Sequence, residues 1–166
     1  MTVVTNTSPL NYLLLIGEAR VLPPLFGLVH LPGAVRAELS APAATEAVRA
    51  WAAAPPDWAC LHTVSPAPLT AAANLHPGET EAILLAIELR ADLLLMDELN
   101  GRAAARAVGL KVIGTLGVLE LAAVRGRLDF RGALHRLGAT NFRATTRLVA
   151  EFLRRDDRRR QQVKPQ

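Results

Sequence analysis

Four oxygen-bearing side chains in this sequence stand next to apolar segments that a folded chain must bury. Asn6 follows V-V-T, Glu38 ends P-G-A-V-R-A-E, Glu79 opens E-T-E-A-I, and Asp97 follows L-L-L-M. Burying a carboxylate costs free energy unless a cation or hydrogen bonds compensate its charge. Oxygen ligands that converge from separate elements suit a hard divalent ion such as Mg²⁺ or Mn²⁺. The pattern therefore predicts a metal-dependent enzyme, with hydrolysis of phosphodiester bonds as the leading chemistry.

The distribution of charge along the chain favours a nucleic-acid substrate. Residues 1–101 carry ten acidic residues and four arginines, a net charge of −6, whereas residues 102–166 carry five acidic and fifteen basic residues, a net charge of +10. Arginine binds phosphate through its planar guanidinium group. An acidic pocket for a metal beside a basic surface for the backbone would suit cleavage of nucleic acid. A GC-rich coding bias would also raise the arginine count.

Length and composition predict one globular domain. The chain has 166 residues, of which 51% are hydrophobic, which is enough for a single substantial core. Its one cysteine, Cys60, cannot form an intramolecular disulfide, which favours a reducing compartment. No segment has the pattern of a secretory signal or the length and apolarity of a membrane span. We therefore expect a soluble cytoplasmic protein with no membrane partner.

Short apolar runs alternate with helical patterns along most of the chain. Strands are expected at residues 2–5, 28–31, 60–64, 93–96 and 111–113. Helices are expected from Ser8 and Pro9 to Gly17, and at 32–38, 45–53, 79–89, 101–108, 115–125, 130–137 and 145–155. This alternation predicts an α/β domain with a parallel sheet and helices on both faces. We expect this domain to cover residues 1–153 and the basic tail 154–166 to be disordered.

The carboxyl ends of parallel strands meet at one edge of a sheet, and sites form there. Asn6 and Asp97 both follow predicted strands, and Thr115 follows the strand at 111–113. We therefore expect Thr115 to line the same pocket. Arg102 and Arg106, one turn apart on the helix after Asp97, could bind the phosphates of a nucleic-acid strand, or could form an ordinary solvated helix face.

Two glutamates compete at the start of the helix predicted at 79–89. Glu79 and Glu81 project about 200° apart, so they cannot face one site together. Glu79 shares a helix face with Ile83 and Ala86 and is the favoured ligand, whereas Glu81 would reach a metal only through water. Glu98 follows Asp97 directly, so it should point elsewhere and likewise contribute through water.

Each candidate ligand also has a purely structural interpretation. Asn6 could shape the turn before the first helix, and Glu38 could be a solvated charge. Glu79 would interact favourably with the N-terminus of its own helix, and Asp97 could be the N-cap of the helix that follows it. Sequence spacing alone leaves these alternatives open.

Five segments of the chain together resemble the PIN-domain superfamily. They are V-T-N-T-S-P-L-N-Y-L-L-L-I-G, L-F-G-L-V-H-L-P-G-A-V-R-A-E-L, G-E-T-E-A-I-L-L-A, A-D-L-L-L-M-D-E and A-V-G-L-K-V-I-G-T-L-G-V-L, which occur in that order between residues 3 and 128. The chain is most similar to the VapC-like subfamily, whose first strand ends in (D/N)-T-S-P-L. The resemblance implies a three-layer α/β/α fold with a short central parallel sheet. It also implies a Mg²⁺- or Mn²⁺-dependent ribonuclease, often a homodimer, that acts as the toxin of a toxin–antitoxin pair.

The resemblance assigns roles to individual positions. The implied catalytic and metal-binding set is Asn6, Glu38, Glu79 and Asp97, and Thr7 and Ser8 would support the first of these. Asn6 departs from the general pattern, because it stands where the family usually has an aspartate and it brings no negative charge. An amide oxygen can still bind a metal, but the loss of charge should weaken cation affinity. The alternative is therefore a degenerate PIN-like protein that binds nucleic acid or a protein partner without cleaving RNA.

Overall fold

Five short parallel strands form the central sheet. They are β1 (Val3–Thr5), β2 (Val29–Pro32), β3 (Ala59–His62), β4 (Leu93–Leu95) and β5 (Val112–Ile113), in the order β3-β2-β1-β4-β5. This is a computed structural model, and it describes residues 1–65, 67 and 75–163. All five predicted strands are confirmed, with ends that differ by one or two residues.

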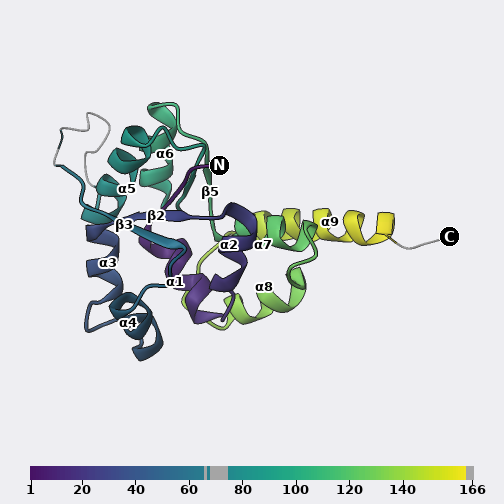
Figure 1. Ribbon diagram of the computed structural model, residues 1–166. Helices are drawn as coiled ribbons and strands as arrows, with labels where there is room; N and C mark the ends of the chain where they lie inside the picture. Colours follow the sequence, from purple (N-terminus) through teal and green to yellow (C-terminus); the bar gives the residue numbers. More distant parts are fainter. Residues whose placement is uncertain (66, 68–74, 164–166) are drawn as a thin grey trace.

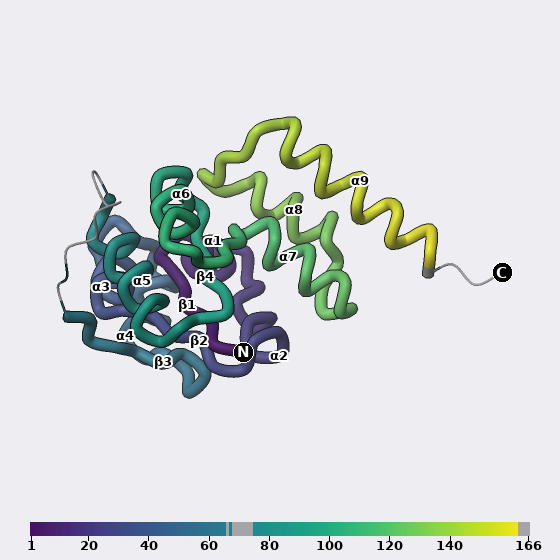
Figure 2. The backbone as a smooth tube through the Cα atoms, turned by 90° about the horizontal axis from the view of Figure 1, so that it is seen from above, coloured from purple at the N-terminus to yellow at the C-terminus, as the bar shows by residue number. Residues whose placement is uncertain are grey.

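Helices cover both faces of the sheet (Figures 1 and 2). They are α1 (Thr7–Leu15), the 3₁₀ helix η1 (Ala19–Val21), α2 (Leu22–Phe26), α3 (Gly33–Leu39), α4 (Glu46–Ala53), α5 (Pro77–Glu88), α6 (Leu99–Ala107), α7 (Thr115–Val124), α8 (Phe130–Gly138) and α9 (Thr146–Val163). Parallel neighbours need crossover connections, which helices supply. The predicted PIN-like α/β/α class is therefore confirmed. The sequence reasoning named no elements at η1 and α2.

Each face of the sheet carries its own core, because side chains alternate along a strand. Val3 and Leu95 pack with α1, α2, α7 and α8 on one face. Val4, Leu94 and Met96 pack with α5 and α6 on the other face. All of these strand side chains are fully buried. The two cores hold β1 and β4 rigidly, and the candidate ligands follow these two strands.

The order of the strands reverses between β1 and β4. The chain passes from β1 outward through β2 to β3, and then returns to place β4 and β5 on the other side of β1. Helices after β1 and β4 therefore diverge at this point, and a crevice forms at the carboxyl edge. The backbone N–H of Asn6 donates to the carbonyl of Leu95 over 2.8 Å, which ties the two strand ends together.

The start of the first helix differs from the sequence prediction. The helix was expected to start at Ser8, but α1 begins at Thr7, and Asn6 occupies the cap position without a capping side-chain hydrogen bond. The hydroxyl of Ser8 donates instead to the carboxylate of Glu98, 90 residues later. The hydroxyl of Ser8 therefore has a distant partner, Glu98, and not a backbone N–H of its own helix.

The prediction of a disordered tail after residue 153 is wrong for residues 154–163, which continue α9 in one helix. Asp156 is only 4% exposed and is paired with Arg159, Arg160 and Arg131. Arg160 also pairs with Asp129 at the start of α8. This ion-pair network supplies the contacts that an apolar face would otherwise provide. Residues 164–166, also part of the predicted tail, lie outside the described residues.

A second group of contacts fastens the middle of α9 to α7. Arg155 donates to both carboxylate oxygens of Glu120, over 2.5 and 3.2 Å, and its guanidinium lies 4.2 Å from the centre of the Phe152 ring. The C-terminal end of α9 extends away from the sheet (Figure 1). Within residues 1–65, 67 and 75–163, no helix is both long and apolar enough to cross a membrane.

The carboxylate of Asp129 caps α8 by accepting a 2.8 Å hydrogen bond from the N–H of Gly132. Asp129→Ala removes this cap, and we expect the free energy of unfolding in urea to fall by about 1 kcal/mol. Asp57→Ala is the matched control, because Asp57 is exposed and makes no side-chain hydrogen bond among the described residues. Its effect should stay within about 0.5 kcal/mol.

The same substitution has a defined pH dependence. The Gly132 N–H, with a further contribution from Arg160, holds the pKa of Asp129 below its ordinary value of 3.8. A lowered pKa in the folded state contributes stability above the unfolded-state value and loses it as the pH falls through the folded-state value. The difference in stability between wild type and Asp129→Ala should therefore narrow below pH 3.8. A difference that stays constant to lower pH would contradict this account.

Candidate metal-binding site

A cavity of about 350 Å³ opens at the carboxyl edge of the sheet, beside the ends of β1 and β4. We call it the acidic pocket, and its lining consists of Asn6, Thr7, Ser8, Glu38, His76, Glu79 and Glu98. Three of these residues are at the N-cap positions of helices: Asn6 for α1, His76 for α5 and Glu98 for α6. Helix N-termini carry partial positive charge, so the backbone here favours anionic groups.

Asn6 is buried at the floor of this site, with 2% of its surface exposed. Its Nδ2 donates to Oε2 of Glu98 over 2.9 Å. Its Oδ1 is buried and finds no hydrogen-bond donor among the described residues. Leaving a buried amide oxygen unsatisfied costs about 1–3 kcal/mol. A cation, or water bound to one, would satisfy this oxygen.

Glu38 joins the end of α3 to the start of α5. Its Oε1 accepts a 2.9 Å hydrogen bond from the N–H of Gly78, and its Oε2 accepts from the hydroxyl of Thr7. Gly78 permits this approach, because a Cβ there would lie 2.6 and 2.7 Å from the two carboxylate oxygens. Glu38 is therefore held in the pocket and is not a freely solvated charge.

Glu79 is 4% exposed, which agrees with the predicted burial of its helix face. Its Oε2 accepts a 2.8 Å hydrogen bond from the backbone N–H of His76, so it also stabilises the first turn of α5. Its Oε1 faces the first turn of α6, where a Cβ at Gly101 would lie only 2.7 Å away. The two interpretations of Glu79 are therefore compatible: its carboxylate lines the pocket and also stabilises the N-terminus of its own helix.

Glu98 lies inside the acidic pocket, contrary to the expectation that it points elsewhere. Its carboxylate accepts from Nδ2 of Asn6 over 2.9 Å and from the hydroxyl of Ser8. Thr7 and Ser8 were expected to support the site, and each donates its hydroxyl to a pocket glutamate. The described structure therefore brings Asn6, Glu38, Glu79 and Glu98 together.

Asp97 is placed differently from these four residues. Its Oδ1 accepts from the N–H of Thr115 over 2.7 Å, and its Oδ2 accepts from the Thr115 hydroxyl over 2.6 Å. Burial raises the pKa of Asp97 above its ordinary value of 3.8, while these hydrogen bonds act in the opposite direction. Thr115 is fully buried and belongs to this contact, so it does not line the acidic pocket. Asp97 lines the neighbouring cleft described below.

Glu81 has a structural partner outside the pocket. Its Oε2 accepts a 2.9 Å hydrogen bond from the N–H of Ala34, in the first turn of α3. An acidic group at that position satisfies a free helix N–H and interacts favourably with the helix dipole. Glu81 was expected to reach a metal through water, but this contact joins α5 to α3 instead.

A second cavity, of about 440 Å³, lies on the other side of Asp97 between α6, β5, α7 and the start of α9. We call it the arginine cleft, because Arg102, Arg106, Arg143 and Arg155 line it. Arg102 donates to the carbonyl of Met96 over 2.7 Å. Burial and the neighbouring Arg106 lower the pKa of Arg102 from its ordinary value, but arginine stays charged in proteins. The two predicted phosphate-binding residues therefore belong to this cleft.

The acidic pocket suits a hard divalent cation. Glu38, Glu79 and Glu98 make no ion pair in the described part of the chain, and the buried Oδ1 of Asn6 has no donor there. No group of three or more His, Cys, Asp or Glu side chains in that part is close enough to hold a metal ion as a compact cluster. Mg²⁺ commonly keeps several waters and binds through one or two carboxylates together with substrate phosphates. An open set of oxygen donors fits this mode of binding.

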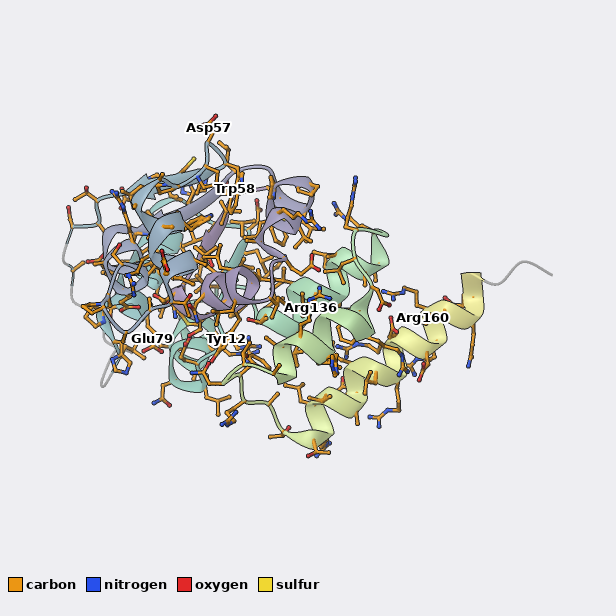
Figure 3. The ribbon with its side chains drawn as sticks, turned by 90° about the horizontal axis from the view of Figure 1, so that it is seen from below. Tyr12, Asp57, Trp58, Glu79, Arg136 and Arg160 are labelled. Carbon is orange, nitrogen blue, oxygen red and sulfur yellow. The ribbon has the colours of Figure 1, made fainter. Side chains whose placement is uncertain are left out.

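Several residues at these two cavities were not expected from the sequence. His76 lines the acidic pocket, and its position directly before P-G-E was a signal for a helix N-cap. Phe142 and Arg143 line the arginine cleft, and Phe142 packs edge-to-face on Tyr12 with ring centres 5.0 Å apart. No local pattern links Tyr12 to Phe142. Figure 3 labels Tyr12 and Glu79, which both lie in the part of the molecule away from Arg160 of α9.

Comparison with known proteins agrees with this geometry. A family model described as a PIN domain matches residues 2–158. No significant match was found among curated proteins or among solved structures.

Gly78→Ala tests whether Glu38 contributes to cation binding. The new Cβ would push the Glu38 carboxylate from its position, so we expect Mn²⁺ affinity to fall about tenfold in a calorimetric titration. The helix itself should persist, because alanine favours helix by about 1 kcal/mol over glycine. Gly138→Ala, in α8, is the matched control, because its Cβ would meet nothing within 4 Å. Equal Mn²⁺ affinity in the two variants would show that Glu38 does not contribute to cation binding.

Proposed function

Because the chain belongs to the PIN-domain family, we propose that it is a Mg²⁺- or Mn²⁺-dependent endoribonuclease. PIN domains are generally nucleases that use divalent metal ions. The proposed metal-facing set is Asn6, Glu38, Glu79 and Glu98, and the substrate is the phosphodiester backbone of RNA.

One observation carries this proposal. Three carboxylates and an unpartnered amide oxygen face one pocket, and none of these carboxylates is paired with a basic side chain in the described residues. Such a concentration of negative charge is costly in a folded protein unless something compensates it. A divalent ion held by Asn6, Glu38, Glu79 and Glu98 would supply that compensation.

Each residue has a defined task in this mechanism. Glu38 and Glu79 hold their positions through the backbone N–H groups of Gly78 and His76. Asn6 holds Glu98 through its amide N–H and presents its oxygen to the site. When bound, the metal would polarise the phosphate and lower the pKa of the attacking water. The N-termini of α1, α5 and α6 favour the negative charge that develops on the phosphate.

We assign Asp97 a positioning role. Its two oxygens are already engaged by Thr115, so it fixes the start of α7 relative to the end of β4. The sequence had favoured Asp97 as a direct ligand, and the contacts now favour its neighbour Glu98. The two assignments make different predictions for conservative substitutions.

The same family resemblance supports a biological setting. We propose that the protein acts as the toxin of a toxin–antitoxin pair, with a cognate antitoxin protein as partner and a homodimer as its assembly. An open acidic pocket that cuts RNA would harm its host without an inhibitor. Expression that arrests growth with the wild-type protein, but not with Glu79→Gln, is the expected result.

Glu79→Gln and Glu98→Gln test the catalytic proposal directly. Each removes one charge while keeping the side-chain shape, so we expect cleavage of mixed RNA with Mn²⁺ to fall at least about 100-fold. Glu88→Gln, at the exposed end of α5, is the matched control and should cleave like wild type. Addition of EDTA should abolish cleavage in every protein. Cleavage by wild type that persists in EDTA would reject the metal-dependent mechanism.

Asp97→Asn distinguishes a positioning role for Asp97 from a role as a direct metal ligand. An amide at position 97 can keep a hydrogen bond to Thr115, so Mn²⁺ affinity should change much less than in Glu98→Gln. If Asp97→Asn instead loses Mn²⁺ binding as completely as Glu79→Gln, Asp97 is a direct ligand. Calorimetric titration of Mn²⁺ without RNA gives this comparison independently of catalysis.

Asn6 favours a second candidate function, a degenerate PIN-like protein that binds RNA or a partner without cleavage. Asn6→Asp would place a carboxylate against Oε2 of Glu98, where the amide N–H now donates over 2.9 Å. We therefore expect the metal-free variant to lose about 1–3 kcal/mol of stability. Mn²⁺ should raise its melting temperature more than that of wild type, because the ion would compensate the added charge. A large gain of cleavage over an inactive wild type would establish the degenerate candidate.

A further inference from the structure

We propose that the arginine cleft is a binding subsite for one nucleotide that flanks the scissile bond of a single-stranded RNA. The subsite would hold the base against the apolar wall and the adjoining phosphates with Arg106 and Arg143. This inference rests on the proposed ribonuclease function, because it takes its substrate from the neighbouring acidic pocket.

The charges of the cleft favour a phosphate ligand. Arg106 and Arg143 are exposed, and neither makes an ion pair among the described residues. Arg155 is engaged by Glu120 and Glu151, so it is less available. Arg102 is fixed by the carbonyl of Met96 and lines the cleft together with Asp97. The cleft thus offers two unpaired guanidinium groups and a third that is already oriented, and these groups bind phosphate well.

The walls of the cleft suit a flat apolar group. Ile113, Leu116 and Leu148 line its interior, together with Phe142 and Phe152. Phe142 is half-buried against Tyr12, so its ring is held in a fixed orientation. Bases stack readily on such rings, and stacking tolerates any base. Tyr12, the aromatic partner of Phe142, is itself partly buried, and burial, followed by the nearby carboxylates of Asp97 and Glu98, raises its pKa.

The two cavities are neighbours at residues 97 and 98. Asp97 lines the arginine cleft and Glu98, the next residue, lines the acidic pocket. Leu99 follows at the first position of α6, lines the cleft and is 83% exposed. An RNA strand whose scissile bond lies beside Glu98 would have to continue past Leu99 on at least one side of that bond. An exposed apolar side chain there suits a base that leaves the acidic pocket.

Continuity with the pocket favours RNA over a segment of an acidic protein. RNA and an acidic protein segment could each pair with the arginines of the cleft. Only a nucleic-acid strand bound at the carboxylates of the acidic pocket would have to continue from there to the arginines. The cleft volume of about 440 Å³ is also of the size of small-ligand pockets and not of an extended protein interface.

The first test measures RNA binding in EDTA, so that the RNA stays intact. The probe is a short fluorescein-labelled single-stranded RNA, followed by anisotropy over a range of KCl concentrations. We expect Arg106→Gln/Arg143→Gln to weaken binding roughly tenfold, and to reduce the slope of log K against log salt by about 1.4, which is 0.7 for each lost phosphate contact. Arg127→Gln, exposed beyond the far end of α7, is the matched control and should leave both quantities unchanged.

The second test locates the base. RNA probes that carry a single abasic position, moved stepwise along the strand, should bind wild type most weakly at one register. Phe142→Leu should weaken binding of intact RNA about fivefold or more and remove the preference for that register. Thermal unfolding followed by circular dichroism verifies that Phe142→Leu is folded. Equal affinity at every abasic register in wild type would show that no base enters the cleft.

The outcomes separate this inference from the proposed function. Metal-dependent cleavage by wild type, with both cleft variants binding RNA like Arg127→Gln, would overturn the subsite alone and leave the cleft to a protein segment. Binding that depends on the cleft, without cleavage under any metal, would support the subsite and reject the ribonuclease. Failure of wild type to bind single-stranded RNA, together with no cleavage under any metal, would overturn both.

Discussion

Uncompensated negative charge at one edge of the sheet is the constraint on which the rest of the site depends. Glu38, Glu79 and Glu98 share a pocket with no basic partner in the described residues. The protein tolerates them because three helices begin there and direct their N-termini toward the carboxylates. Backbone N–H groups and hydroxyls donate hydrogen bonds to these carboxylates but bring no positive charge. This absence of a counter-charge is the reason for proposing a cation in the pocket.

This arrangement depends on features that are far apart in the chain. The parallel order β2-β1-β4-β5 places the ends of four strands in one row, and the reversal between β1 and β4 opens the crevice. Gly78 and Gly101 then let two carboxylates approach helix backbones more closely than any side chain would permit. The two cores fix the strands, and the ion pairs of α9 hold the last helix against α7 and α8. The site therefore relies on the sheet for position and on small residues for access.

The sequence predicts the strands well, because each is a short apolar run whose flanking residues end it. It also predicts the burial of Glu79, since helical phase alone separates it from Glu81. The different surroundings of Asp97 and Glu98 were beyond it, because Asp97 is held by a hydrogen bond from Thr115, 18 residues later, and only Glu98 lines the acidic pocket. The helical course of residues 154–163 was missed for a related reason, since Asp156 is satisfied by arginines and not by an apolar face. Pairing across the chain leaves no local pattern.

The adjacency of the acidic pocket and the arginine cleft has a thermodynamic consequence. Residues 97 and 98 border different cavities, so a strand that occupied both cavities would meet charges of opposite sign, whose effect salt screens over roughly 8–10 Å. Without a cation, the carboxylates repel the same phosphates that the arginines attract. A cation in the pocket would remove that repulsion and raise RNA affinity. Linkage then requires RNA to raise cation affinity by the same factor, so substrate and metal would each recruit the other to the site.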